Sequence, residues 1–173
     1  YNNRGYARRK LGLFEFAIED YTRSLELQPE NVKSLNNRGY CFAKLGQYED
    51  AVRDYTQVLK IEPRNTHAFH NRGISFDKLG EYNKAVEDLT EAVRLDPSNA
   101  NALFNRGSAL DSLGEYDRAI ADFTQALELD MASTRPNQGF GSPTTRASME
   151  SLQSVSRKSL TASAPSRAQA QRA

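Results

Sequence analysis

Apolar residues form pairs of helical stripes along the first three quarters of the chain, and a glycine separates the two stripes of each pair. In the clearest copy the first stripe is Leu35, Phe42 and Leu45, and the second is Ala51, Val52, Tyr55, Val58 and Leu59. Intervals of three, four and seven residues place side chains on one face of an α-helix. Gly46 follows the first stripe, and glycine readily takes the positive φ that ends a helix. The pattern therefore predicts two amphipathic helices joined by a tight turn.

Polar residues and prolines mark the ends of these helices. Asn31 and Asn65 each stand just before a first helix, where the side-chain oxygen accepts a hydrogen bond from a free backbone N–H group. Tyr48 begins a second helix, and Pro63 follows its end because the residue before a proline avoids the α conformation. We therefore expect short, well-defined connections between helices.

Each copy of the helix pair starts 34 residues after the previous one. The copies start at Tyr1, Leu35, Phe69 and Leu103. A fixed period of this length is typical of a solenoid, in which one unit cannot bury its apolar face without its neighbours. We therefore expect an all-α fold with four repeats, at about residues 1–31, 32–65, 66–99 and 100–131.

Two small residues recur in every repeat. The glycine column is Gly5, Gly39, Gly73 and Gly107, and the alanine column is Ala17, Ala51, Ala85 and Ala119. A glycine in a helix interior costs about 1 kcal/mol relative to alanine. A cost repeated four times indicates close helix packing, and we expect the alanine column to form the opposing surface.

The pattern G-x2-F in the first helix, A-x3-Y/F in the second and a proline after it, over 34 residues, resembles the tetratricopeptide repeat family. The resemblance covers Tyr1 to about Asp130, and four copies in register make it specific. It implies a right-handed α-solenoid of antiparallel helix pairs that binds a peptide or partner protein in a concave groove. In the first repeat, Arg8 stands where the family has a large apolar residue.

Four asparagines occupy the helix face that lines the groove in this family. They are Asn3, Asn37, Asn71 and Asn105. An amide side chain offers both a donor and an acceptor, so it can hold the N–H and C=O of one peptide unit. Such a ladder resembles the repeat arm of O-GlcNAc transferase, which holds extended peptides this way. The alternative is that these amides bond neighbouring backbone between repeats.

Three further polar columns repeat. Arginine occupies positions 4, 38, 72 and 106 (Arg4, Arg38, Arg72, Arg106), and aspartate follows 16 residues later at Asp20, Asp54, Asp88 and Asp122. An arginine beside a packing glycine is hard to bury unless it is paired, so we expect structural ion pairs across each helix pair. The third column is Thr22, Thr56, Thr90 and Thr124, whose hydroxyls we expect to bond a carbonyl of their own helix.

The remaining groove positions vary, and we expect them to set specificity. The first two repeats offer Tyr6, Arg9, Lys10, Lys33, Tyr40 and Lys44, and the last two offer His67, His70, Asp77, Phe104 and Asp111. The predicted groove therefore runs from basic to acidic. His67 and His70 alone, without a cysteine or carboxylate beside them, do not make a metal site.

The composition changes at residue 132, where Ser, Ala, Thr and Arg become frequent and large apolar residues sparse. We interpret residues 132–173 as a low-complexity tail that cannot bury enough surface to order itself. One short helix at about 148–160 is the exception, with Ser148 as N-cap and Met149, Leu152, Val155 and Leu160 on one side.

The charge divides at the same place. The tail has six basic residues and one acid, a net charge of +5, whereas the whole chain has +1, which leaves −4 on the repeats. An acidic repeat array argues against nucleic acid as its ligand. The basic tail is a candidate for contact with an acidic protein surface, the chain's own repeats included.

No nucleophile–base pair, phosphate loop or metal-ligand cluster stands out in the sequence. We expect no catalytic residue, no metal and no cofactor, and we interpret the lone Cys41 as a reduced core residue. The predicted function is a protein-interaction scaffold or adaptor in the cytoplasm, with no membrane partner. Two alternatives are a substrate-recruiting arm of a larger enzyme and a structural component of a cytoskeletal or ciliary assembly.

Overall fold

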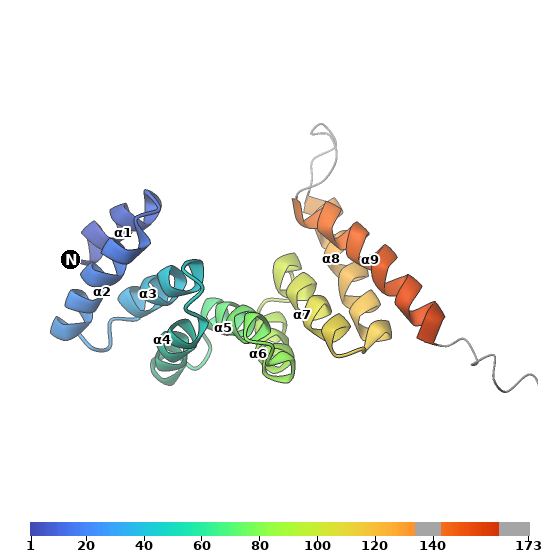
Figure 1. Cartoon of the computed structure of the whole chain (residues 1–173), viewed down its shortest axis with the longest axis horizontal. Helices are drawn as coiled ribbons and strands as arrows, with labels where there is room; N and C mark the ends of the chain where they lie inside the picture. The colour runs from blue at the N-terminus through green and yellow to red at the C-terminus, as the bar shows by residue number, and fades with distance from the viewer. Residues whose placement is uncertain (134–142, 163–173) are drawn as a thin grey trace, which may run out of the picture. The chain divides into compact units, whose positions relative to one another are not determined.

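The computed structural model describes residues 1–133 and 143–162, which form α-helices and no strand (Figure 1). The helices are α1 (Asn2–Lys10), α2 (Phe14–Leu27), α3 (Val32–Lys44), α4 (Tyr48–Ile61), α5 (Thr66–Lys78), α6 (Tyr82–Leu95), α7 (Ala100–Ser112), α8 (Tyr116–Ser133) and α9 (Pro143–Ala162). The all-α prediction is confirmed. The chain divides into two compact units, Tyr1–Pro97 with α1 to α6 and Ser98–Ala173 with α7 to α9.

The predicted helix ends are confirmed at the level of single atoms. The Asn31 side chain accepts from the Ser34 N–H at 3.0 Å, and that of Asn65 accepts from the Ala68 N–H at 2.9 Å. Between α3 and α4, Gly46 has a φ of +77°, a conformation that costs glycine little and other residues more. The sequence therefore determines the turns locally, before any packing between repeats.

In the first unit each first helix packs against the second helix of its repeat and against its neighbours in the array. Helix α2 also contacts α3, and α4 contacts α5, while α1 touches α3 and α3 touches α5. The first helices therefore lie next to one another in sequence order. We call the surface formed by α1, α3 and α5 the A-helix face. The interior behind it is filled by buried side chains such as Tyr21, Tyr55, Val58 and Leu89.

The glycine column marks the closest helix approach, but the opposing surface is not mainly alanine. A Cβ at Gly39 would lie 3.1 Å from ring carbons of Tyr55, and one at Gly107 would lie 2.8 Å from Phe123 Cε1. The alanines Ala51 and Ala119 are fully buried, one helical turn before these aromatic residues. The glycines therefore make room for a large side chain. The alanine column contributes to the opposing surface at Gly73, where a Cβ would lie 3.3 Å from the Ala85 carbonyl oxygen.

In the second unit α7 and α8 form a helix pair, and α9 packs along α8 and also touches α7 (Figure 1). Residues 143–162 form one helix, α9, which contains the short helix predicted at about 148–160 and begins five residues earlier. Ser148 is not an N-cap: it lies inside α9 and is fully buried, as is Val155, whereas Met149 is exposed. The parts of the tail prediction on residues 134–142 and 163–173 lie outside the described residues.

Candidate functional site

The four predicted ion pairs form in all repeats. Arg38 donates from Nε and Nη2 to the two oxygens of Asp54 at 2.8 and 2.7 Å. Arg72 with Asp88 and Arg106 with Asp122 repeat this geometry at 2.7 to 2.8 Å. The aspartates are buried, while the side chains of Arg38, Arg72 and Arg106 stay about one fifth exposed. These residues hold each helix pair together and do not offer free charges to a ligand.

Two members of the threonine column connect repeats, contrary to the prediction that their hydroxyls bond their own helix. Arg38 Nη1 donates to Thr22 Oγ1, and Arg72 Nη1 donates to Thr56 Oγ1, both at 3.0 Å. Thr124 behaves as predicted and donates to the Ile120 carbonyl at 2.8 Å. Arg38 and Arg72 thus each bond the aspartate of their own repeat and the threonine of the preceding one.

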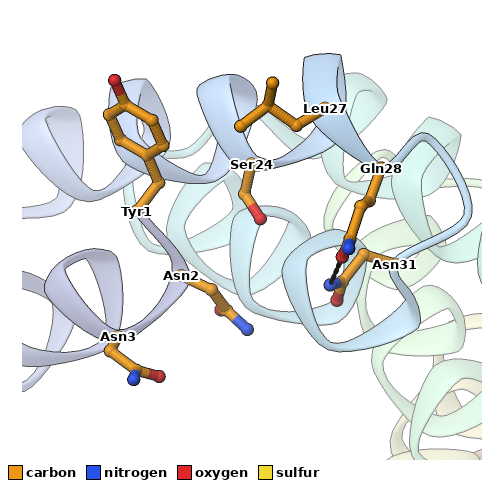
Figure 2. A pocket seen from close by; sticks show the side chains of 7 residues that line it. All are labelled: Tyr1, Asn2, Asn3, Ser24, Leu27, Gln28 and Asn31. Atoms are coloured by element: carbon orange, nitrogen blue, oxygen red, sulfur yellow. Dashed lines mark hydrogen bonds between the residues drawn. The ribbon is translucent and has the colours of Figure 1, made fainter.

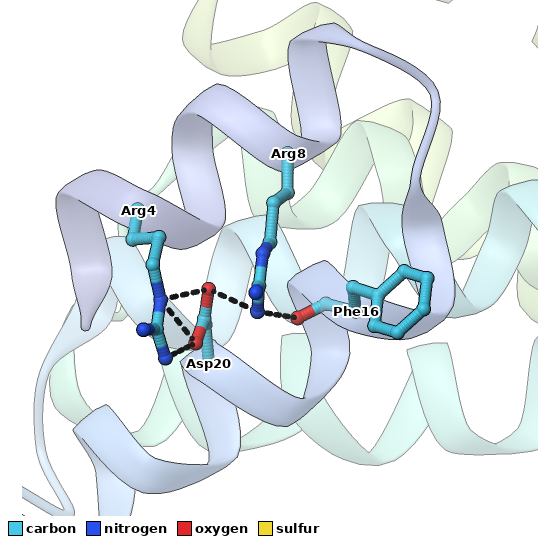
Figure 3. Close-up of polar contacts among 4 residues, drawn as sticks. All are labelled: Arg4, Arg8, Phe16 and Asp20. Atoms are coloured by element: carbon cyan, nitrogen blue, oxygen red, sulfur yellow. Dashed lines mark hydrogen bonds and ion pairs between the residues drawn. The ribbon is translucent and has the colours of Figure 1, made fainter.

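In the first repeat the buried aspartate has a second arginine partner, because Arg8 stands where the family has a large apolar residue. Figure 3 shows Arg4 and Arg8 on either side of Asp20, with Nη2 of Arg4 at 2.6 Å and Nη1 of Arg8 at 2.9 Å from its oxygens. Arg8 also donates to the Phe16 carbonyl. The hydrogen bond from Arg4, followed by the nearby positive charges, lowers the pKa of Asp20 against the effect of burial. Asp20 is therefore held ionised.

The asparagine column lies on the A-helix face within the first unit. Asn3, Asn37 and Asn71 come from α1, α3 and α5, and each is at least partly exposed. Within residues 1–133 and 143–162, none of these three amides makes a hydrogen bond to the protein. The alternative that they bond backbone between repeats is therefore not what the structure contains. Asn105 lies on α7, in the second unit.

A pocket of about 400 Å³ lies at the start of the first unit, lined by Tyr1, Asn2, Asn3, Ser24, Leu27, Gln28 and Asn31 (Figure 2). Asn31 Nδ2 donates to Gln28 Oε1 at 3.0 Å across its rim. Among the predicted binding residues only Asn3 reaches this pocket. Most of the residues that line the pocket are polar, and none of their side chains is charged.

Among the charged residues predicted for the groove, the acidic ones form ion pairs within the chain and the two lysines of α3 are exposed. Lys33 and Lys44 on α3 are exposed, and Tyr40 between them is partly buried. Asp77 pairs with Lys78 at 3.3 Å, and Asp111 pairs with Lys158 of α9 at 2.7 Å. The acidic residues are therefore compensated within the chain. Lys158 is the residue of α9 that makes this ion pair with α7.

The two remaining predicted residues lie apart. His70 is a half-buried residue of α5 in the first unit. Phe104 belongs to α7, and its ring centroid lies 5.5 Å from that of Phe123, so much of Phe104 serves the interior of the second unit. The sequence reasoning missed Lys78 and Lys158. Lys10, Lys44 and Lys78 recur at the 34-residue period, so the period could have identified Lys78.

Comparison with known proteins identifies the family. Two tetratricopeptide repeat family models match the chain, one at residues 1–31 and 32–65 and the other at residues 70–134. The chain belongs to the tetratricopeptide repeat family, whose members serve as protein-interaction scaffolds. No curated protein matches the sequence.

Solved structures share the fold. A crystal structure of MamA matches with a TM-score of 0.72 and 22% identity over 91% of this chain and 95% of that one. The first repeat domain of Spaghetti (RPAP3), bound to the HSP90 peptide SRMEEVD, matches at 0.64 and 26% identity over 75% and 93%. The Arabidopsis OM64 repeat domain matches at 0.62 and 29% identity over 72% and 96%. The last two relatives therefore share both fold and a modest part of the sequence.

Among the residues that the structure describes, no helix is long and apolar enough to cross a bilayer. The same residues contain no cluster of three or more His, Cys, Asp or Glu side chains arranged to hold a metal ion.

Proposed function

We propose that the first unit binds an extended peptide segment of a partner protein along the A-helix face. Asn3, Asn37 and Asn71 would hold the ligand backbone, each through its side-chain N–H and C=O groups. The variable residues around them would select ligand side chains. On this proposal the chain is a scaffold or adaptor with no catalytic residue of its own, and it acts in the cytoplasm.

The observation that carries the proposal is the state of the three amides. Each is accessible, each lies on a successive first helix, and none is used by the described part of the chain. A polar column kept through three repeats without an internal bond is available for an external partner. The equivalent arginine and aspartate columns, by contrast, are fully engaged in pairs.

The relative that was solved with a peptide supports the same mode. Spaghetti (RPAP3), at 26% identity, carries the peptide SRMEEVD on its first repeat domain. A repeat domain of this fold therefore accommodates a short linear segment. We propose that this chain also binds a short linear segment, and the proposal does not specify the sequence of that segment.

A selection from a random peptide library tests the proposal. The full chain is immobilised, selected peptides are synthesised, and affinity is measured for the parent and for an Asn3→Ala, Asn37→Ala, Asn71→Ala variant. Each lost amide contact removes about 0.5–1.5 kcal/mol, so the triple variant should bind at least about tenfold more weakly. Circular dichroism should show an unchanged fold.

A matched variant controls for the loss of polar surface. Asn83→Ala removes an exposed asparagine from α6, outside the A-helix face, and should bind like the parent. A triple variant that stays folded and binds as tightly as the parent would contradict the proposed mode. A selection that yields no peptide would contradict peptide binding by this chain altogether.

A further inference from the structure

Cationic and aromatic side chains gather where α1 and α3 end. We call Tyr6, Arg9, Lys10, Tyr40 and Lys44 the basic cluster. The guanidinium carbon of Arg9 lies 5.1 Å from the ring centroid of Tyr6 and 5.0 Å from that of Tyr40, so it is held between the two rings. Lys10 Nζ lies 5.5 Å from Tyr6, and Lys44 Nζ lies 5.3 Å from Tyr40. Three positive charges are therefore concentrated over two neighbouring rings.

Nothing in the described part of the chain neutralises these charges. Over residues 1–133 and 143–162, no carboxylate forms an ion pair with Arg9, Lys10 or Lys44. Arg9 Nε is buried and lacks a hydrogen-bond partner among the same residues. The exposed ammonium groups of Lys10 and Lys44 are therefore available to an external anion.

The groups behind Arg9 cannot act as counter-charges at neutral pH. Burial raises the pKa of Tyr21 to about 12, and the positive charge of Arg9 and its hydrogen bond with Tyr21 only partly oppose this. Burial likewise raises the pKa of the Cys41 thiol to about 11. Both groups are therefore uncharged, and Asp20, the nearest buried carboxylate, is already bound by Arg4 and Arg8.

Corresponding positions in later repeats show the opposite situation. Asp77 and Asp111 stand at the position of Arg9, displaced by two and three periods. Each has a lysine of the same chain beside it, Lys78 and Lys158. The acids at this position are thus satisfied internally, whereas the arginine is not.

A purely structural role explains part of this arrangement. Cation–π contacts join α1 to α3, and lysines in the last turn interact favourably with the helix dipole. That role does not require three cations to gather at one place without a carboxylate. An anionic ligand accounts for this gathering.

We infer that the basic cluster binds a run of aspartate or glutamate side chains in an extended partner peptide. The inference rests on the proposed peptide-binding function and names the class of partner. Carboxylates would accept from Arg9, Lys10 and Lys44, while the tyrosine rings exclude water and strengthen these contacts. The cluster lies on the same stripes of α1 and α3 as Asn3 and Asn37, one to two turns further along.

Fluorescence anisotropy on the full chain tests the inference. The probe is a fluorescein-labelled decapeptide of alternating glutamate and serine, and its partner probe carries glutamine in place of glutamate. The parent should bind the acidic probe at least about tenfold more tightly, as charge-assisted hydrogen bonds are stronger than neutral ones. The preference should shrink as salt is raised, because ions screen exposed charges.

Exposed lysines provide variants that leave the fold intact. The Lys10→Glu, Lys44→Glu variant should lose the preference for the acidic probe. A Lys60→Glu, Arg64→Glu variant makes the same charge change at exposed positions away from the cluster and should retain most of the preference. Arg9→Gln should also weaken binding, with circular dichroism reporting its fold. Equal binding of both probes by the parent, or unchanged binding by the Lys10/Lys44 variant, would overturn the inference.

Two further outcomes separate this inference from its alternatives. A fluorescein-labelled oligothymidine that binds more tightly than the acidic probe would identify a nucleic-acid surface and overturn it, because stacking rings and cations also suit single strands. Suppose that library peptides lose affinity when Asn37 and Asn71 are replaced but not when Lys10 and Lys44 are replaced. That result would support the proposed function and would refute the acidic ligand.

Discussion

Arg72 of α5 and Asp88 of α6 meet in a two-point contact, in which Nε and Nη2 donate to the two carboxylate oxygens at 2.7 and 2.8 Å. The remaining nitrogen, Nη1, donates to Thr56 in the preceding repeat. One side chain therefore fixes both the pairing of two helices and the register between two repeats. This relationship explains why arginine, aspartate and threonine recur together at the 34-residue period.

Removing Arg72 should be costly, and removing Arg4 should cost far less. Arg72→Ala leaves the buried Asp88 without its partner, and such a loss typically destabilises a protein by about 3–5 kcal/mol. Arg4 is 58% exposed, and Arg8 continues to serve Asp20 when Arg4 is absent. Urea denaturation of both variants measures the difference. Equal losses would show that the arginines act by packing and not by pairing.

The stability of the chain should fall in acid partly through Asp20. Its pKa is lowered in the folded protein, mainly by the hydrogen bond from Arg4 and then by the nearby positive charges. Its stabilising contribution is therefore complete above the unfolded pKa of about 4 and is lost as the pH falls through the folded pKa. The free energy of unfolding, measured from pH 6 to pH 2, should drop less steeply for Asp20→Asn. Parallel curves for parent and variant would contradict this account.

The period made much of this fold predictable, since the positive-φ glycines and the Arg–Asp pairs each follow from one rule that applies in all four repeats, and the asparagine caps follow from one that applies in three. The bonds from Arg38 to Thr22 and from Arg72 to Thr56 were not predictable in the same way. A threonine hydroxyl in a helix has a partner available in its own backbone, and only the position of the next repeat decides between the two. Tertiary packing therefore overrode a sound local expectation.

The tail helix is longer than its apolar spacing predicted. Ser, Thr and Ala dominate α9, so composition alone indicates disorder, yet small residues also allow close packing against α8. Val155 and Ser148 are buried in that contact. For the candidate site, the sequence located Asn3, Asn37, Asn71, Lys33, Lys44 and Tyr40 on the expected helices. It did not show that the charge of Asp111 is neutralised, because its partner Lys158 is 47 residues away in the sequence.

Alanine at Gly107 should destabilise the second unit although alanine is the better helix former. The new Cβ would lie 2.8 Å from Phe123 Cε1, and the Phe123 ring is buried and cannot move aside freely. Overpacking of this kind costs about 1–3 kcal/mol, which outweighs a helix-propensity gain of about 1 kcal/mol. A double-mutant cycle with Phe123→Leu should recover part of the loss. A Gly107→Ala variant more stable than the parent would refute close packing as the reason for the glycine column.

Helix α9 should be part of the folded second unit. Val155 is 1% exposed, so Val155→Asp would place an unpaired charge in the contact with α8 and should lower the melting temperature by several degrees. Arg157→Asp introduces the same side chain at an exposed position two residues away and serves as the control. Identical melting curves for the two variants would show that α9 adds nothing to the stability of the unit.

The central claim is that the amides of Asn3, Asn37 and Asn71 bind a peptide backbone, and the side-chain NH₂ signals of these asparagines test it most directly. They are assigned in a ¹H–¹⁵N spectrum of the full chain by comparison with the single Asn→Ala variants, and a library-selected peptide is then titrated. The account predicts that the signals of Asn37 and Asn71 shift in proportion to bound peptide, as free amides become hydrogen-bonded, while that of Asn83 on α6 stays in place. Saturating peptide that leaves the Asn3, Asn37 and Asn71 signals unmoved would contradict the account.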